Sequence, residues 1–146
     1  MKLLFETPIE RPYLEVRDGF NQKLFEVLKP PGVGLDVDRF DGCKKGDEFS
    51  LAISMMGQKQ KWQGVVTADE TTPDEWYFID EGKVLPWPLT AWKHIHRVVK
   101  VSENSSKIID DITFEVATPW LLPFVAPGLW LTFAIRPYKY QQYFRK

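Results

Sequence analysis

One stretch of sequence decides the fold. Residues 90–117 read TAWKHIHRVVKVSENSSKIIDDITFEVA, two runs on either side of the polar loop 103–106. In each run, large apolar side chains alternate with polar or charged ones, which is typical of half-buried β-strands. The polar residues between the runs favour a hairpin loop. We therefore expect two antiparallel strands, at 90–101 and 107–117.

The same alternation extends toward the N-terminus. Residues 33–38, 48–55, 59–68 and 75–81 each alternate apolar with polar side chains, and residues 2–8 are apolar enough for a short opening strand. Turn signals such as Asp41-Gly42 and Gly46-Asp47 separate the runs. Strands joined by such short turns are antiparallel, which excludes an alternating α/β fold with a parallel sheet. Two prolines exclude residues 82–88 from a regular sheet interior.

Two stretches have a helical period instead. Residues 10–28 place apolar side chains at steps of three and four, and Pro30-Pro31-Gly32 ends that helix. A second apolar stripe follows Pro119 and consists of Leu122, Ala126, Leu129, Phe133, Tyr140 and Phe144. We expect one long helix over about 120–145, with Leu129 and Phe133 almost fully buried. Pro137 predicts a kink or a break within it.

The start of that helix could also suggest a membrane span. Twenty uncharged residues separate Glu115 from Arg136, which is long enough to cross a bilayer. Pro119, Pro123 and Pro127 interrupt them, and lipid cannot replace the backbone hydrogen bonds that a proline removes. We therefore expect a buried helix that begins at a proline, and no membrane span.

These elements predict an α+β fold. A curved antiparallel sheet of six to seven strands must bury one face, and only the long C-terminal helix remains to cover it. The expected solution is a sheet wrapped around that helix with space between them. The 146 residues suit a single domain, 1–146.

The composition of the chain excludes some classes of partner and indicates a cellular compartment. The net charge of −1 lacks the basic excess of a nucleic-acid binder, so no nucleic-acid partner is expected. The single cysteine, Cys43, excludes an intrachain disulfide and zinc sites built from several cysteines. The apolar run at the start of the chain is too short for a signal-peptide core, so a reducing, cytoplasmic setting is expected.

Three groups of residues carry a resemblance to a known family. The stretch Arg39-Phe40-Asp41-Gly42, the pair of segments 78–80 and 92–96, and the segments 110–114 and 133–136 occur in the order and spacing of that family. The chain resembles the START-like, or SRPBCC, superfamily, whose helix-grip fold is that of the birch-pollen allergen, and within it an uncharacterised bacterial ligand-binding subgroup. The resemblance implies an enclosed apolar cavity for a lipid, a polyketide or a similar hydrophobic molecule.

The candidate polar site lies on the two quoted strands. His94 and His96 share one strand face with Trp92, while Lys93 and Arg97 share the other, so the histidines are expected to point inward. Asp110 lies in an apolar row, where a carboxylate must be paired or protonated.

Three interpretations of this patch remain open at this stage: a metal site, a patch that contacts a ligand, or a satisfied buried network. A structural Asp110 would pair with His96 or with Arg136. With a loop at 102–106, Val98 falls opposite Asp110 and His96 lies diagonal to it. We expect no metal and no cofactor.

The aromatic side chains, 14% of the chain, favour a cavity over a closed core. The expected ligand-binding residues are Trp62, Trp76, Phe78, Trp92, His94, His96, Asp110, Phe114, Leu129 and Phe133. Trp120 and Trp130 are further candidates for the wall, and Trp87, between two prolines, for a lid or a packing plug. We expect Cys43 to be a surface thiol and Asp80-Glu81 to be a solvated strand end.

Three functions are compatible with these features. The first is binding of a hydrophobic small molecule without catalysis, and no catalytic residue is assigned. The second is an enzyme of cyclase or hydro-lyase type that uses His and Asp as acid and base. The third is a co-chaperone-like or dimeric interaction protein with a closed core; a homodimer is also compatible with the first two. A large apolar cavity would favour the first two over the third.

Overall fold

The computed structural model describes residues 1–30, 32–55 and 57–145; Pro31, part of the expected helix end, lies outside them. The elements follow in the order β1 (Lys2–Ile9), α1 (Tyr13–Asp18), α2 (Gln22–Val27), β2 (Gly34–Phe40), β3 (Glu48–Met55), β4 (Gln58–Thr71), β5 (Glu75–Val84), β6 (Leu89–Ser102), β7 (Ser105–Val116), the 3-10 turn η1 (Pro119–Leu121), α3 (Leu122–Ala134) and α4 (Arg136–Phe144).

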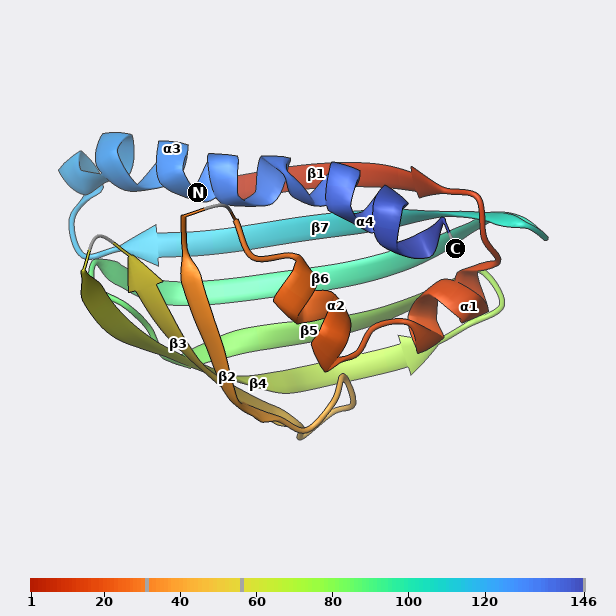
Figure 1. Ribbon diagram of the computed structural model, residues 1–146, viewed down its shortest axis with the longest axis horizontal. Helices are drawn as coiled ribbons and strands as arrows, with labels where there is room; N and C mark the ends of the chain where they lie inside the picture. The colour runs from red at the N-terminus through yellow and green to blue at the C-terminus, as the bar shows by residue number, and fades with distance from the viewer. Residues whose placement is uncertain (31, 56, 146) are drawn as a thin grey trace.

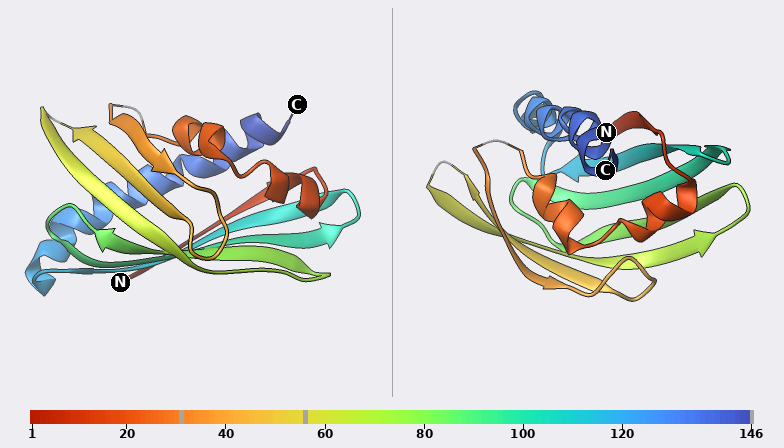
Figure 2. Two further views of the ribbon diagram at one scale, coloured as in Figure 1. Left: turned by 90° about the horizontal axis from the view of Figure 1, so that it is seen from below. Right: turned by 45° about the vertical axis from the view of Figure 1, so that its right-hand side comes forward.

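The seven strands form one curved sheet in the order β1-β7-β6-β5-β4-β3-β2, with every neighbouring pair antiparallel. Helices α3 and α4 run along its concave side, and α1 and α2 lie over one end of it (Figure 1; Figure 2). The α+β class and the curved sheet are therefore confirmed. On β6, Trp92, His94 and His96 are buried while Lys93 is exposed, as the alternation predicts.

The N-terminal helix is not continuous, so the prediction of one helix over 10–28 is wrong. Helix α1 ends at Asp18 with Gly19 as its C-cap. Helix α2 starts after Asn21, whose side-chain oxygen accepts a hydrogen bond from the Leu24 backbone N–H. The break lets both helices turn a buried residue, Val16 and Leu24, toward the sheet.

The C-terminal helix is broken as well, close to where Pro137 predicted a kink or a break. Ile135 separates α3 from α4. A proline lacks the N–H that would bond to residue 133, and its ring disfavours helical geometry at the preceding turn. The expected single helix over 120–145 therefore consists of two helices and a 3-10 turn.

Helix α3 is less buried than expected. Phe133 is buried, but Leu129 is only half-buried, and four large apolar side chains of η1 and α3 are exposed: Trp120, Phe124, Trp130 and Leu131. In the described residues, no helix combines the length and the apolar character that a membrane span requires.

The two helices differ in how they are attached. From α4, Lys139 Nζ donates to the carbonyls of Val27 and Lys29, and Gln141 donates to that of Pro8. Arg11 donates to the Phe144 carbonyl. In the described chain, the one side-chain hydrogen bond of α3 is from Thr132 to Gly128 in the same helix.

The register of the β6–β7 hairpin differs from the expectation. Val98 lies opposite Ile108 and His96 opposite Asp110. The turn uses only two residues, because Ser102 pairs with Ser105, and an irregularity between Lys100 and Ser102 shifts the register by one further residue. The shift of two residues leaves each side chain on its expected face, since strand parity has a period of two.

Two apolar clusters fill the space between sheet and helices. One lies beneath α1, α2 and α4 and includes Val16, Phe20, Leu24, Trp76, Val98, Ile108 and Tyr140. The other lies beneath α3 and includes Leu3, Leu89, Trp92, Ile112, Phe114, Ala126 and Phe133. Both clusters border the cavity described below: Phe78 of the first cluster lines it, as do Trp92 and Phe133 of the second.

Two buried phenylalanines test this division. Phe114 is fully enclosed, so Phe114→Ala should lower the free energy of unfolding by about 3–5 kcal/mol. Phe133 faces space that is already empty on one side, so Phe133→Ala should cost at least about 1 kcal/mol less. Urea unfolding of both variants measures the difference, and a larger loss at Phe133 would contradict this placement.

Candidate functional site

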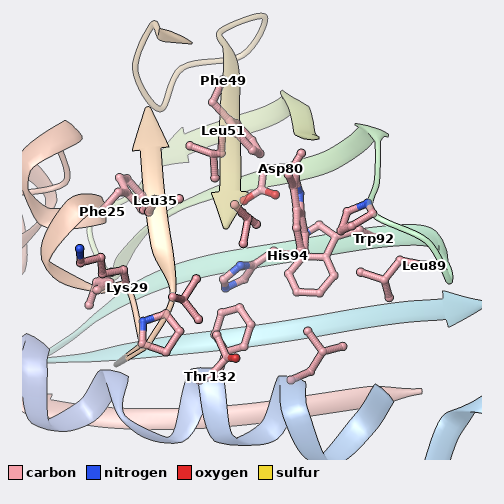
Figure 3. A pocket seen from close by; sticks show the side chains of 18 of the residues that line it. Phe25, Lys29, Leu35, Phe49, Leu51, Asp80, Leu89, Trp92, His94 and Thr132 are labelled. Atoms are coloured by element: carbon pink, nitrogen blue, oxygen red, sulfur yellow. The ribbon is translucent and has the colours of Figure 1, made fainter. Parts of the chain in front are cut away.

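A cavity of about 690 Å³ lies between the concave face of the sheet and α3 (Figure 3). Its wall is mostly apolar and includes Leu35, Leu51, Trp62, Phe78, Trp92 and Phe133. Trp62 and Trp92 meet edge to face, with ring centroids 4.7 Å apart. Such wide rigid rings leave space that smaller, flexible side chains would fill.

The cavity reaches solvent at one side. Trp87, between Pro86 and Pro88, and Phe124 at the start of α3 both line it, yet they are 73% and 77% exposed. Lys29 and Gln58 also lie on this rim. The mouth therefore lies between the segment 86–88, the start of α3 and the edge strands.

Seven of the ten residues expected to bind a ligand line the cavity: Trp62, Phe78, Trp92, His94, His96, Leu129 and Phe133. Trp76, Phe114 and Asp110 do not. Trp76 packs edge to face on Phe20 at 5.2 Å in the cluster beneath α1, α2 and α4, and Phe114 is sealed within the cluster beneath α3. Trp120 and Trp130, the two other candidates, do not line the cavity either and are 69% and 52% exposed.

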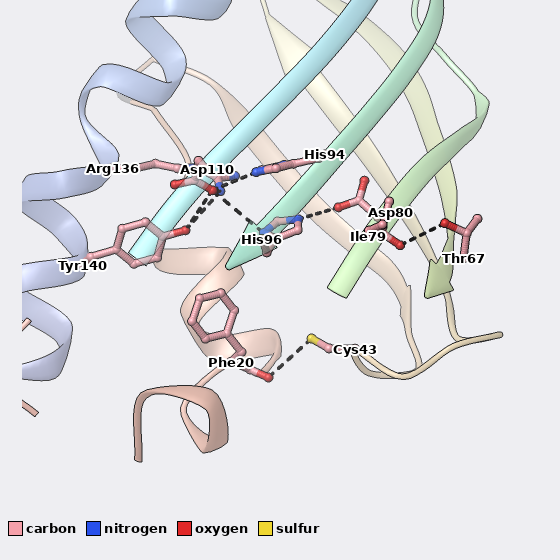
Figure 4. Close-up of polar contacts among 10 residues, drawn as sticks. All are labelled: Phe20, Cys43, Thr67, Ile79, Asp80, His94, His96, Asp110, Arg136 and Tyr140. Carbon is pink, nitrogen blue, oxygen red and sulfur yellow. Dashed lines mark hydrogen bonds and ion pairs between the residues drawn. The ribbon is translucent and has the colours of Figure 1, made fainter. Parts of the chain in front are cut away.

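Two histidine–carboxylate pairs form a buried polar cluster beside the cavity (Figure 4). His94 Nε2 lies 2.8 Å from Asp110 Oδ1, and His96 Nε2 lies 2.5 Å from Asp80 Oδ2. Arg136 Nη1 and the Tyr140 hydroxyl also donate to Asp110 Oδ1, each at 3.4 Å. All four members of the two pairs are buried, as such polar groups can be only when hydrogen-bonded.

Aromatic stacking fixes the orientation of both imidazoles. The His94 and His96 ring centroids are 3.5 Å apart with a 23° angle between the planes, and Phe78 stacks on the other face of His96 at 4.1 Å. The rings therefore present their nitrogens sideways, toward the carboxylates and the cavity.

Comparison with known proteins identifies the fold of the chain. No protein-family model matches the chain, and neither does any curated protein sequence. Among solved structures, the Zhui aromatase/cyclase from Streptomyces sp. R1128 superposes with a TM-score of 0.70 at 8% identity, over 97% of this chain and 92% of that one. Norcoclaurine synthase from Thalictrum flavum gives 0.70 at 12% identity, over 97% and 84%. The chain has the helix-grip fold.

The resemblance to the START-like superfamily is thus confirmed at the level of fold. The di-domain aromatase/cyclase BexL also superposes, with a TM-score of 0.70 at 14% identity over 97% of this chain. This chain spans 45% of that longer one. At these identities the likeness concerns the helix-grip fold, and the site must be interpreted from its own residues.

Asp80 is the member of the cluster that the sequence analysis missed. It was expected at a solvated strand end, but it is buried and bonded to His96. It follows Phe78 by two residues on β5, so strand parity alone could have placed it inward. Asp110 was expected to pair with His96 or Arg136; it bonds to His94 and Arg136, because the hairpin register differs.

The surroundings set the charges of the cluster. Burial raises the pKa of Asp110, but the His94 hydrogen bond and the Arg136 charge outweigh it and lower that pKa to about 2. Burial and the neighbouring His94 lower the pKa of His96 to about 4, against the opposing effect of Asp80. The pKa of Asp80 is also lowered: burial opposes this, but the hydrogen bond from His96 prevails.

The arrangement fits hydrogen-bonded pairs better than a metal centre. Ligand atoms of Asp80, His94 and His96 lie within 4.8 Å of one another. A metal ion binds along the in-plane lone pairs of imidazoles, at about 2.0–2.1 Å for zinc. The two rings are stacked with their planes nearly parallel, so their in-plane lone pairs lie in separate planes and do not converge on one ion.

Cys43 is half-buried on the cavity wall, so the expectation of a surface thiol is wrong. Its Sγ donates to the Phe20 carbonyl at 3.7 Å. Burial, together with the charge of Asp80, raises the pKa of the thiol to about 12. The neighbouring lysines therefore do not lower the pKa of this thiol, and the neutral thiol is favoured over the nucleophilic thiolate.

Neighbouring aspartates provide a matched test of the cluster. Asp110→Asn removes the charge that balances the largely buried Arg136, so the free energy of unfolding should fall by about 3–5 kcal/mol. Asp111→Asn removes a partner of exposed Lys2, and the change should stay within about 1 kcal/mol. Chemical denaturation of both variants checks this, and equal losses would show that Asp110 has no special role.

The low pKa of His96 predicts a dependence of stability on pH. An unfolded histidine titrates near ~6.5, so between there and about pH 4 the unfolded chain binds a proton that folded His96 does not. The free energy of unfolding should therefore decrease on acidification through this window, by on the order of 3 kcal/mol from His96. Urea unfolding across the window should show a shallower decrease in His96→Gln than in the unmodified protein; identical decreases would refute the assignment.

Proposed function

We propose that the cavity binds a hydrophobic small molecule such as a lipid or a polyketide. The observation that carries the proposal is the cavity of about 690 Å³, which falls within the roughly 300–1,000 Å³ of small-molecule sites. Its lining is mostly apolar, with a few buried polar groups at one place, which is the usual composition of such sites. Trp62, Phe78, Trp92, Leu129 and Phe133 would supply apolar contacts.

The affinity for such a ligand would come mainly from the apolar surface of the cavity wall. Each Å² of apolar surface removed from water contributes about 25 cal/mol. Aromatic side chains on the sheet and on α3 would enclose the body of the ligand from two sides. His94, His96 and Asp80 would then orient its polar end.

A cavity of this size argues against the interaction protein with a closed core. The enzyme alternative has one specific observation in its favour: His94, on the cavity wall, is held by a 2.8 Å hydrogen bond to Asp110. A histidine oriented by a carboxylate can act as a general acid or base. Two of the similar structures are named as aromatase/cyclases.

Native mass spectrometry of gently purified protein tests binding and separates the two functions. A co-purified apolar compound, extracted and returned to the protein, should be recovered with its mass unchanged if the protein is a binder. A reproducible change of its mass that requires His94 would favour the enzyme. If no apolar compound co-purifies, displaces a bound fluorescent dye or shifts the melting temperature, the binding proposal fails.

Filling part of the cavity should weaken binding. Leu129→Trp adds bulk on the face of α3 that lines the cavity, and we expect it to reduce binding of an environment-sensitive apolar dye at least tenfold, about 1.4 kcal/mol. Leu131→Trp, on the same helix but 64% exposed, is the control and should leave dye binding unchanged. Fluorescence titration measures both, and equal effects would place the dye outside the cavity.

A further inference from the structure

The hydrogen bonds of the polar cluster define which atoms remain free for a ligand. Each imidazole uses Nε2 as the donor to a carboxylate oxygen, His94 to Asp110 and His96 to Asp80. In a neutral imidazole the other nitrogen, Nδ1, is then an acceptor. Burial and His94 lower the pKa of His96, which supports its neutral form.

The two Nδ1 atoms differ in their access to the cavity. Nδ1 of His96 is sealed and has no hydrogen-bond partner, while 3.9 Å separates it from Asp110 Oδ1. Nδ1 of His94 likewise has no partner among the described residues, but it is not one of the sealed atoms, and His94 lines the cavity. Figure 3 shows the His94 ring in the space between the sheet and α3. A ligand can therefore reach this acceptor.

Asp80 supplies a second acceptor at the same place. It lines the cavity, and in the described residues only Oδ2 is engaged, with His96. One side-chain N or O atom of Asp80 and one of His94 lie within 4.8 Å of each other. The two residues are therefore close enough for one donor group of a ligand to approach both, so the polar end of the cavity is rich in acceptors.

The charges of the cluster also favour a hydrogen-bond donor as the polar group of the ligand. With neutral imidazoles, the cluster contains two carboxylates, Asp80 and Asp110, and one cation, Arg136. Arg136 Nη1 is engaged by Asp110 and Tyr140, its Nε is sealed, and its guanidinium lies 4.3 Å over the Phe133 ring. The cluster thus carries one excess negative charge.

We propose that the polar end of the ligand is a hydrogen-bond donor, a hydroxyl or a protonated amine, held by His94 Nδ1 and Asp80, and that the site rejects carboxylates. The inference rests on the proposed function and adds the chemical class of the ligand. An ether oxygen or a carboxylate would face two acceptors without a donor, and buried acceptors left unpaired are costly. A carboxylate would in addition meet the excess negative charge.

A matched series of fluorescent probes tests this on the unmodified protein at pH 7: pyrene, 1-pyrenemethanol, its methyl ether, 1-pyrenemethylamine and 1-pyrenecarboxylate. We expect the alcohol to bind about tenfold more tightly than the methyl ether, and the carboxylate to bind at least about tenfold more weakly than the alcohol. If the amine binds most tightly, the excess charge contributes; if the alcohol does, the acceptors alone decide. Either order supports the proposal.

The failures of the two proposals are distinguishable. If neither pyrene nor any derivative binds, the proposed function fails. If pyrene binds but the carboxylate binds as tightly as the alcohol, or the ether equals the alcohol, the donor requirement is overturned and the hydrophobic cavity site stands.

A variant locates the preference within the cavity. Asp80→Asn retains an oxygen that can accept from His96 but removes the charge, so the affinity ratio of amine to carboxylate should fall about tenfold. Asp111→Asn is the matched control, because its side chain pairs with Lys2 away from the cavity, and the ratio should not change. Equal effects in both variants would overturn the role of Asp80.

The assignment of His94 has a test that needs no ligand. Nitrogen-15 NMR of the free protein at pH 7 should show a pyridine-type signal for Nδ1 of His94 and a protonated Nε2. A proton on Nδ1 would turn this acceptor into a donor and overturn the proposal.

Discussion

The structure depends on the burial of two carboxylates, Asp80 and Asp110, beneath its helices. A carboxylate removed from water must receive hydrogen bonds or an opposite charge, or it becomes protonated. Each therefore takes a histidine from β6, and Asp110 takes Arg136 and Tyr140 from α4 as well. This requirement ties three neighbouring strands to the C-terminal helix at one level of the molecule.

The polar cluster also divides the interior. On one side, α1 and α2 pack their apolar faces onto the sheet and leave a solid core around Phe20 and Trp76. On the other side, α3 covers the sheet, and the cavity remains open toward Trp87 and Phe124. Asp80 and both histidines thus meet the cavity at its inner wall, where a few polar groups can distinguish otherwise similar apolar molecules.

Strand parity predicted much of this arrangement. The alternation around Trp92 placed both histidines inside, and the number of strands and the covering helix followed from the hairpin pattern. The pairing of His94 with Asp110 could not be predicted, because it depends on a turn of two residues and on an irregularity in the strand pairing between Lys100 and Ser102. Strand parity with Phe78 predicts that Asp80 points inward, but the turn residues that follow Asp80 favour a solvated strand end instead. The division of the aromatic side chains between core and cavity depends on where α1 and α2 lie, and capping at Gly19 and Asn21 decides that.

The unequal attachment of the two C-terminal helices has a consequence for dynamics. Helix α4 shares hydrogen bonds with three separate segments of the N-terminal third, whereas α3 relies on apolar contacts and is separated from α4 at Ile135. Segments with few anchoring contacts open locally at a lower free energy than the whole chain unfolds. Backbone amide hydrogens of α3 should therefore exchange with solvent before those of α4. Helix α3, which covers the cavity, can open locally while the hydrogen bonds of the polar cluster remain formed.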